Sequence, residues 1–364
     1  MTNREAQIYQ WITENPMISQ EELAAKAGIT RSSVAVHISN LMKKGYILGK
    51  GYITNDLAYI TVIGTAGVDI SGRPDESWDA MDSNSGTVSI SIGGAGRNIA
   101  HNLRLMGCNV KFISAFGGDN YAHRIIDNCN KYGIDISDCM MLGEEFDTSS
   151  YLYIAGADGM KQLALSDMKI YKNLTVEYFK KKVESINQSQ AVVLDTGIPK
   201  ETLEFLVKKI TVPVFVRTVS GKKTGRIRNI LPEIDTILLN TVEAGILTDM
   251  QVDAKDDNSL ERAAAKLMET GVRRVCIVTG GEGVYCAEET MKKKIPFSFA
   301  DKSSDIGLKD AFMAGIVNAH TRGYAPEESV RIAVAAASIA SENEYAVNEK
   351  MNWQEVMKRA EINK

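Results

Sequence analysis

The chain has 364 residues, of which 44% are hydrophobic and 24% charged, a composition typical of folded globular proteins that excludes disordered and fibrous classes. The formal net charge of −4 gives no overall attraction to nucleic acid or to an anionic membrane, so any such binding must come from a local patch. Five cysteines without a Cys-x-x-Cys pair disfavour a zinc site and indicate reduced thiols.

The N-terminal stretch 1–16 carries charges where a signal peptide needs an apolar core. No apolar run approaches the roughly 20 residues that a membrane span requires. We therefore expect a cytoplasmic protein without a membrane partner.

Residues 1–28 predict two short helices with clear ends. The first helix places apolar residues on one face at helical spacing and ends before Pro16. The second begins at Ser19, which stands in capping-box spacing with Glu22, and it closes at Gly28, a C-cap position.

The segment 31–45 predicts a third helix with a buried and a polar face. Its buried positions, at helical spacing, are Val34, Ile38 and Leu41. The polar side chains left outside are Arg31, Ser32, Ser33, His37 and Asn40. Residues 46–54 then read as two short strands around the Gly-Lys-Gly at 49–51.

Together these elements resemble a winged helix-turn-helix domain over residues 1–55, whose polar-faced helix would enter the major groove and whose hairpin would reach the DNA backbone. The residues expected to contact DNA are Arg31, Ser32, Ser33, His37 and Lys50. Residues 1–55 hold six Lys or Arg against four Glu, a surplus of two, which predicts weak DNA binding unless the domain dimerises. The alternative is a small interaction or dimerisation module.

Residues 58–364 alternate short apolar runs with amphipathic helix patterns. The apolar runs, rich in branched residues, are 59–70, 110–117, 191–197, 212–217, 236–240 and 274–281. The helix patterns between them include 96–107, 121–133, 202–210 and 260–271. This alternation predicts an α/β layered sheet with right-handed crossovers.

Two stretches break this rhythm, because 85–94 and 148–168 alternate with period two. The second does so around an Ala-Asp-Gly turn at 157–159. We expect both to be antiparallel and peripheral, and to form a lid from segments of about 70–95 and 148–166.

Ligands of open α/β sheets bind beyond the carboxyl ends of the strands, so the residues after each apolar run are the candidate site. These are Asp69, the Gly-Gly-Ala-Gly-Arg-Asn at 93–98, the Asn-Thr-Val-Glu at 240–243, the Thr-Gly-Gly-Glu-Gly at 279–283 and the stretch 303–315. Each has a plain structural interpretation as well. Asp69 suits a turn or an N-cap, Asn240 an N-cap, and 279–283 a hairpin turn.

The motifs at 93–107 and 304–315, at opposite ends of one α/β domain, resemble the two signatures of the ribokinase-like (phosphofructokinase B type) family of carbohydrate and nucleoside kinases. The stretches 64–73 and 82–103 and the front domain resemble the branch that contains pseudouridine kinases, some of which carry a helix-turn-helix domain. The resemblance implies a three-layer α/β/α sandwich with a small β lid.

The resemblance also assigns roles to the candidate residues. The sugar would be bound by Asp69, Gly93, Gly94 and Asn98. Asp310 would be the general base for the attacking hydroxyl, and the amides of Gly307 to Asp310 would stabilise the transferring phosphoryl group.

The nucleotide and its metal have candidates on the other strands. Asn240 and Glu243 would orient Mg²⁺, with Glu243 as the candidate metal ligand. Thr279 and Gly281 would line the phosphates of ATP. The histidines at 101, 123 and 320 lie in helix patterns and are expected at the surface or in packing, and Cys276 and Cys286 are expected to be buried thiols.

The family pattern at 304–310 is usually Asp-Thr-Thr-Gly-Ala-Gly-Asp, and this chain has Ser-Asp-Ile-Gly-Leu-Lys-Asp, which keeps only Gly307 and Asp310. If position 309 needs a positive φ, lysine there costs roughly 1–2 kcal/mol. Lys309 would fill the γ-phosphate pocket, replace amide stabilisation with its charge, or pair with Asp310 and lower the pKa of that base.

The resemblance implies an enzyme that uses ATP and Mg²⁺ to phosphorylate a sugar or nucleoside, with pseudouridine as the expected acceptor and pseudouridine 5′-phosphate as the product. We expect a homodimer that also binds DNA through residues 1–55. The alternative is a transcriptional regulator whose altered kinase domain senses a nucleoside or sugar.

Overall fold

The computed structural model describes residues 1–47, 49, 58–77, 79, 81–156, 161–296, 307–343 and 345–362. The chain divides into two units, Met1–Ala58 and Tyr59–Lys364. Within the described residues, no helix is long and apolar enough to cross a membrane.

The N-terminal unit contains three helices, α1 (Asn3–Glu14), α2 (Gln20–Ala27) and α3 (Arg31–Lys43). The capping box of Ser19 and Glu22 begins α2, and Gly28 ends it at a φ of 63°, as the sequence predicts. The shared core consists of Ile8, Ile12, Ile18, Leu23, Val34, Ile38, Leu41 and Ile47. The expected hairpin, with Lys50, lies almost entirely outside the described residues.

The described part of the larger unit is built on an eight-stranded sheet in the order β14-β13-β12-β11-β10-β9-β1-β4. Its parallel strands are β1 (Tyr59–Ile63), β4 (Asn109–Ile113), β9 (Ala191–Asp195), β10 (Val214–Arg217), β11 (Thr236–Asn240) and β12 (Arg274–Val278). The antiparallel strands β13 (Val284–Glu288) and β14 (Met291–Ile295) extend one edge. All six predicted apolar runs therefore contribute parallel strands.

Helices cover both faces of this sheet and give the predicted three layers. One apolar core joins the sheet to α4 (Ala95–Leu105), α5 (Asn120–Lys131), α12 (Leu308–Thr321), α13 (Pro326–Ala340) and α14 (Trp353–Arg359). The other face carries α6 (Val176–Lys180), α7 (Val183–Asn187), α8 (Lys200–Lys209), α10 (Thr241–Thr248) and α11 (Asp257–Met268). Short elements complete the unit: β5 (Ala115–Phe116), β6 (Met140–Met141), η1 (Lys169–Asn173), α9 (Gly221–Thr224), η2 (Gly225–Glu233) and η3 (Gly280–Glu282).

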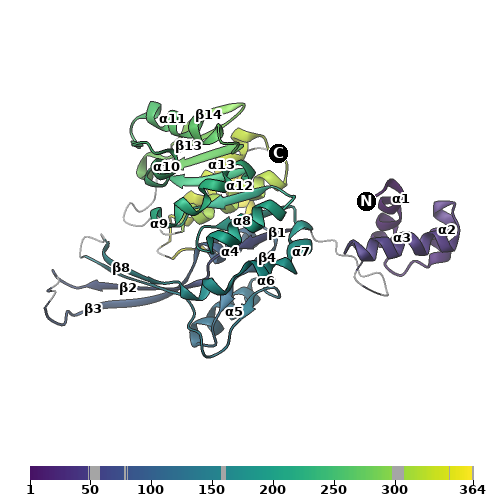
Figure 1. Cartoon of the computed structure of the whole chain (residues 1–364), viewed down its shortest axis with the longest axis horizontal. Helices are drawn as coiled ribbons and strands as arrows, with labels where there is room; N and C mark the ends of the chain where they lie inside the picture. Colours follow the sequence, from purple (N-terminus) through teal and green to yellow (C-terminus); the bar gives the residue numbers. More distant parts are fainter. Residues whose placement is uncertain are drawn as a thin grey trace. The chain divides into compact units, whose positions relative to one another are not determined.

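A second sheet of the described residues, in the order β3-β2-β7-β8, forms the lid. Its strands are β2 (Gly67–Pro74), β3 (Gly86–Gly93), β7 (Ser150–Ala155) and β8 (Lys161–Asp167), and they project from the α/β body (Figure 1). The pairs β2–β3 and β7–β8 are antiparallel, as expected, but β2 and β7 are parallel. The turn at 157–160 lies outside the described residues.

The interpretation of 59–70 as one buried strand is wrong. The chain leaves the main sheet after Ile63, and residues 67–74 form β2 of the lid instead. The turn at 64–66 redirects it, because Gly64 lies against Asp195 and Gly96, where a side chain would not fit. Asp69 therefore lies on a lid strand and not at the end of a strand of the main sheet.

Candidate active site

The glycine loop before α4 brings two of the expected sugar-binding elements together. Gly94 is the N-cap of α4 at a φ of 93°, and a Cβ there would lie 2.5 Å from the Cα of Ala66. A Cβ on Gly93 would lie 2.3 Å from Oδ2 of Asp69. Gly94 therefore requires glycine, and at Gly93 the absence of a side chain lets the carboxylate of Asp69 lie against the backbone of the loop.

Asp195 fixes this loop, and the sequence analysis missed it. Its Oδ2 accepts hydrogen bonds from the amide and the hydroxyl of Thr65, at 2.6 and 2.8 Å, and from the amide of Gly96 at 3.1 Å. Its Oδ1 accepts from the amide of Gly197 at 2.7 Å. The carboxylate is 1% exposed and ties the ends of β1 and β9 to the start of α4. An aspartate at the end of a buried strand was the available signal.

The expected general base lies at the start of α12. Gly307 is its N-cap at a φ of 77°, and a Cβ there would lie 2.0 Å from the carbonyl oxygen of Ala346. Asp310, in the first turn, is 3% exposed. Its Oδ2 accepts a hydrogen bond of 2.9 Å from Nδ2 of Asn98, which is also buried. The two signature motifs of the sequence therefore meet through one side-chain contact.

Arg217, at the carboxyl end of β10, is a second residue that the sequence analysis missed. Its Nε lies 2.8 Å from Oδ1 of Asp310, and both side chains are nearly buried. Its Nη1 donates to the carbonyl oxygen of Thr218 at 2.8 Å. Oδ2 of the expected base thus accepts a hydrogen bond from Asn98, whereas Oδ1 faces Arg217 in an ion pair without a hydrogen bond. The signal was a charged residue that ends an apolar strand.

Lys309 lies in the first turn of α12, and it does not have the positive φ that the sequence analysis considered. Its Nζ lies 3.4 Å from Oε2 of Glu243, so it pairs with that residue, whereas Asp310 pairs with Arg217. Burial, and then the positive charge of Arg217, lowers the pKa of Lys309. Residues 303–306 of the same loop lie outside the described residues.

Asn240 and Glu243 form a capping box at the start of α10. Oδ1 of Asn240 accepts from the amide of Glu243, and Oε2 of Glu243 accepts from the amide of Asn240, both at 2.8 Å. Oε2 of Glu243 also accepts from the hydroxyl of Thr218 at 2.7 Å, and this glutamate is 1% exposed. The plain interpretation of Asn240 as an N-cap is thus correct, and the contact with Mg²⁺ stays a prediction.

Thr279 and Gly281 lie in the turn between β12 and β13. The amide and the hydroxyl of Thr279 both donate to the carbonyl oxygen of Gly283 at 2.9 Å. Gly281 lies in the short helix η3. The turn is the hairpin that the plain interpretation expects, and the contact with ATP phosphates stays a prediction.

The centre of the site therefore holds two carboxylates and two cations in alternating pairs, Arg217 with Asp310 and Lys309 with Glu243. Among the described residues, no group of three or more His, Cys, Asp or Glu side chains is arranged to hold a metal ion. These side chains do not form a magnesium site by themselves.

The face of the lid that carries Asp69 is polar and aromatic. Directly paired residues of neighbouring strands lie on one face, and Asp69 pairs with Ser91 on one side and with Tyr151 on the other. Tyr153, two residues on, shares this face, and the two tyrosine rings are 5.7 Å apart. The sequence analysis did not select either tyrosine.

The described candidates for DNA contact lie on α3. Arg31 is exposed and forms a surface ion pair with Glu21 at 3.0 Å. The hydroxyls of Ser32 and Ser33 each lie 2.9 Å from that of Thr30, the N-cap of the helix. His37 is half-buried. Lys50 lies outside the described residues.

Known proteins share both units. Residues 57–352 match the model of the pfkB family carbohydrate kinases, and residues 2–47 match a winged helix-turn-helix DNA-binding model. The uncharacterized sugar kinase YeiI of Escherichia coli is 36% identical over 93% of this chain and 94% of its own. The pseudouridine kinase of the same organism is 33% identical over 83% of this chain and 96% of its own. The structure of a carbohydrate kinase from Agrobacterium tumefaciens, 25% identical, covers 84% of this chain and 97% of its own with a TM-score of 0.71.

Proposed function

The chain belongs to the pfkB family of carbohydrate kinases and is a sugar or nucleoside kinase, and we propose that it transfers the γ-phosphoryl group of ATP to the 5′-hydroxyl of pseudouridine. The observation that carries this proposal is the contact between Asn98 and Asp310. Asn98 lies in the first turn of α4, next to the glycine loop against which the carboxylate of Asp69 lies, and this supports the proposal. Sugar recognition and proton removal therefore fall in one place.

In the proposed reaction, Asp310 accepts the proton of the 5′-hydroxyl while the hydroxyl oxygen attacks the γ-phosphorus. The bond between that phosphorus and the β,γ-bridging oxygen breaks, and ADP leaves. The amides at residues 308–310, at the N-terminus of α12, face the charge that develops on the phosphoryl oxygens.

Arg217 has two positions in this scheme. In the present structure it occupies Oδ1 of Asp310, the oxygen that the incoming hydroxyl needs. When the hydroxyl binds there, the guanidinium is released toward the phosphates of ATP, where its planar donors suit phosphoryl oxygens. Lys309 then supplies a second cation beside them.

The lid supports a nucleoside over a free sugar as the acceptor. Tyr151 and Tyr153 lie next to Asp69 on the same face, so a ribose held by Asp69 would place its base against a tyrosine ring. The pseudouridine kinase relative agrees with this acceptor.

The test is release of ADP from ATP and magnesium with pseudouridine, uridine, inosine, ribose and fructose, for the wild type and Asp310→Asn. We expect turnover on pseudouridine, and we expect Asp310→Asn to lower kcat by about 10²–10⁴-fold while pseudouridine still raises the melting temperature. Turnover on another acceptor alone would reject pseudouridine as the substrate.

A second candidate function rests on the two internal ion pairs. Because Arg217 and Lys309 neutralise both carboxylates of the site, the domain could hold a nucleoside without transferring phosphate and pass that signal to the N-terminal unit. The same assay separates the two functions. A wild type that binds pseudouridine without releasing ADP supports the sensor.

We also propose that the N-terminal unit binds DNA through the exposed face of α3. Its match to a winged helix-turn-helix model supports this, but the surface ion pair of Arg31 leaves few cations for phosphates. Selection of binding sequences from random DNA, followed by Arg31→Glu, tests it: the variant should bind the selected DNA more weakly at every salt concentration.

Since ATP and DNA are both intracellular, we propose that the protein works in the cytoplasm.

We propose a homodimer formed through the lid. The face opposite Asp69 is apolar, and four of its side chains are exposed, Val88 at 71%, Ile90 at 41%, Leu163 at 51% and Leu165 at 60%. The register places them in two cross-strand rows with Ile70, Leu152 and Ile154. An apolar sheet face of this kind is the usual mark of an interface, and a second copy of the same face would cover it.

A further inference from the structure

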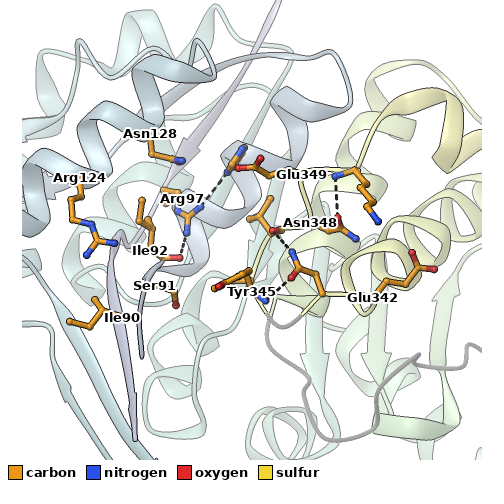
Figure 2. Close-up of a pocket in the computed structure, with 15 residues that line it drawn as sticks. Ile90, Ser91, Ile92, Arg97, Arg124, Asn128, Glu342, Tyr345, Asn348 and Glu349 are labelled. Carbon is orange, nitrogen blue, oxygen red and sulfur yellow. Dashed lines mark hydrogen bonds between the residues drawn. The ribbon is translucent and has the colours of Figure 1, made fainter. Parts of the chain in front are cut away.

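The larger unit contains a pocket of about 660 Å³ (Figure 2). It lies between β3, α4, α5 and the residues 342–343 and 345–350, and none of the residues assigned above to sugar, phosphate or proton transfer lines it. Its volume is in the range of cavities that bind small metabolites. Among the described residues that line it, a buried cation has no counterion and some buried polar atoms have no hydrogen-bond partner.

Arg97 is the buried cation of this pocket. It is 3% exposed, and its guanidinium donates to the carbonyl oxygens of Ile92 and Gly93, the latter at 3.4 Å. No described acidic residue forms an ion pair with it. Burial lowers its pKa to about 10, against the weaker effects of Cys129, Asp69 and Asp310. A buried charge is normally paired with an opposite charge. Arg97 has no such counterion among the described residues.

His101, one turn further along α4, presents a free donor. It is 2% exposed, and its Nδ1 lies 3.3 Å from Nη1 of Arg97, which can only donate. Nδ1 is therefore the acceptor, and the proton of the neutral ring is on Nε2, which has no partner among the described residues. Oδ1 of Asn128, from α5, is likewise buried without a partner there.

The remaining charges of the pocket favour an anion. Its two described glutamates are already matched: Glu342 pairs with Arg359 at 2.5 Å, and Glu349 accepts from the hydroxyl of Tyr132 at 2.5 Å and lies 3.7 Å from Lys131. Two exposed cations, Arg124 and Lys350, also line the pocket and have no ion pair with a described residue. Tyr345, 55% exposed, offers an aromatic surface at the same opening.

We propose that this pocket binds a small phosphate monoester, a sugar phosphate or nucleoside monophosphate, as an effector of the kinase. Its phosphate is held by the field of Arg97 and by the donors of Arg124 and His101, and its sugar or base lies against Tyr345. Binding of the ester in this pocket affects the active site through α4, because Arg97 directly precedes Asn98, the partner of Asp310. An anion beside Arg97 changes the electrostatic field at Asp69 and Asp310, on which that cation acts.

The experiment is calorimetric titration of Asp310→Asn with inorganic phosphate, ribose 5-phosphate and UMP, repeated in the presence of saturating ATP and pseudouridine. Using the inactive variant with its active site filled separates this pocket from phosphate binding at the catalytic centre. The pocket variant is Arg124→Glu in the same background, chosen because the side chain is exposed and outside the core. The matched control is Lys208→Glu on α8, an exposed charge reversal that does not line the pocket.

We expect one of the two esters to bind with a Kd below about 1 mM whether or not the active site is filled. Arg124→Glu should weaken this binding about tenfold or more, and Lys208→Glu should leave it unchanged. Binding of inorganic phosphate alone would show an anion site without the ester specificity and would overturn the proposal. So would binding that ATP and pseudouridine abolish, or binding that Arg124→Glu does not change. None of these outcomes depends on turnover, so the result stands apart from the test of the kinase reaction.

Discussion

Asp310 and Arg217 form a buried ion pair of 2.8 Å in the centre of the site, between the first turn of α12 and the carboxyl end of β10. Arg217 covers Oδ1 of the expected base without a hydrogen bond, and Asn98 donates a hydrogen bond to Oδ2. In the proposed reaction, a phosphate acceptor displaces Arg217 before Asp310 receives its proton.

The first prediction concerns this displacement. If the released guanidinium stabilises the transferring phosphoryl group, Arg217→Ala should lower kcat by about 10²–10³-fold with little change in the KM for pseudouridine. Arg217→Lys keeps the charge but loses the planar donors, so its kcat should lie between those of the wild type and Arg217→Ala. Steady-state kinetics at saturating ATP measures this. A faster Arg217→Ala enzyme would mean that Arg217 only restrains the base.

The second prediction concerns Lys309 and Glu243. Removing the lysine leaves the buried carboxylate of Glu243 without its cation, which increases its attraction for magnesium on ATP but removes a positive charge beside the phosphates. Lys309→Met should lower kcat by about 10–100-fold and reach its half-maximal rate at a lower magnesium concentration. Lys208→Met, on the surface of α8, is the control. An unchanged magnesium dependence would show that Glu243 does not act on the metal.

Local signals in the sequence predict local structure well here. The capping box of Ser19 and Glu22, the C-cap at Gly28 and the N-cap at Asn240 lie where they were expected, and each of the six apolar runs contributes a parallel strand, because these features depend on residues close together in the chain. The contact of Arg217 with Asp310 joins two distant segments, so no spacing rule identifies it. The split of 59–70 into a body strand and a lid strand likewise depends on Asp195, whose contacts with Thr65 and Gly96 exist only in the folded chain.

The third prediction is a pH dependence of stability. Burial, and then the charge of Arg97, lowers the pKa of His101 from its usual 6.5 to about 3. Below pH 6.5 the unfolded chain binds a proton that the folded chain refuses, so His101 costs stability increasingly as pH falls from 6.5 toward 3. Between pH 6.5 and 5 this amounts to about 2 kcal/mol. Chemical denaturation should show this loss in the wild type and a smaller loss in His101→Gln. His123→Gln, at an exposed histidine on α5, should behave as the wild type does.

The fourth prediction tests the lid as a base-recognition surface. Tyr153→Ala should raise the KM for pseudouridine about tenfold, because a ring that stacks on the base is lost. The affinity for free ribose, measured as competitive inhibition, should stay the same, and Tyr153→Phe should retain most of the pseudouridine affinity. An equal loss for ribose and pseudouridine would place Tyr153 in lid packing and not against the base.

The fifth prediction concerns the opposite face of the lid. Leu165, on the edge strand β8, is 60% exposed and ends a cross-strand row with Leu152, Ile70 and Ile90, so it would lie within a lid-to-lid interface. Leu165→Lys should convert a dimer to a monomer in light scattering, since a charge buried in an apolar interface has no partner there. Because the residue is on the surface of the isolated chain, the fold should survive, and an unchanged circular dichroism spectrum checks this. Lys208→Glu, on α8, should leave the mass unchanged. A wild type that is monomeric at all concentrations, or a Leu165→Lys variant that remains dimeric, would mean that this apolar face does not join two copies of the chain.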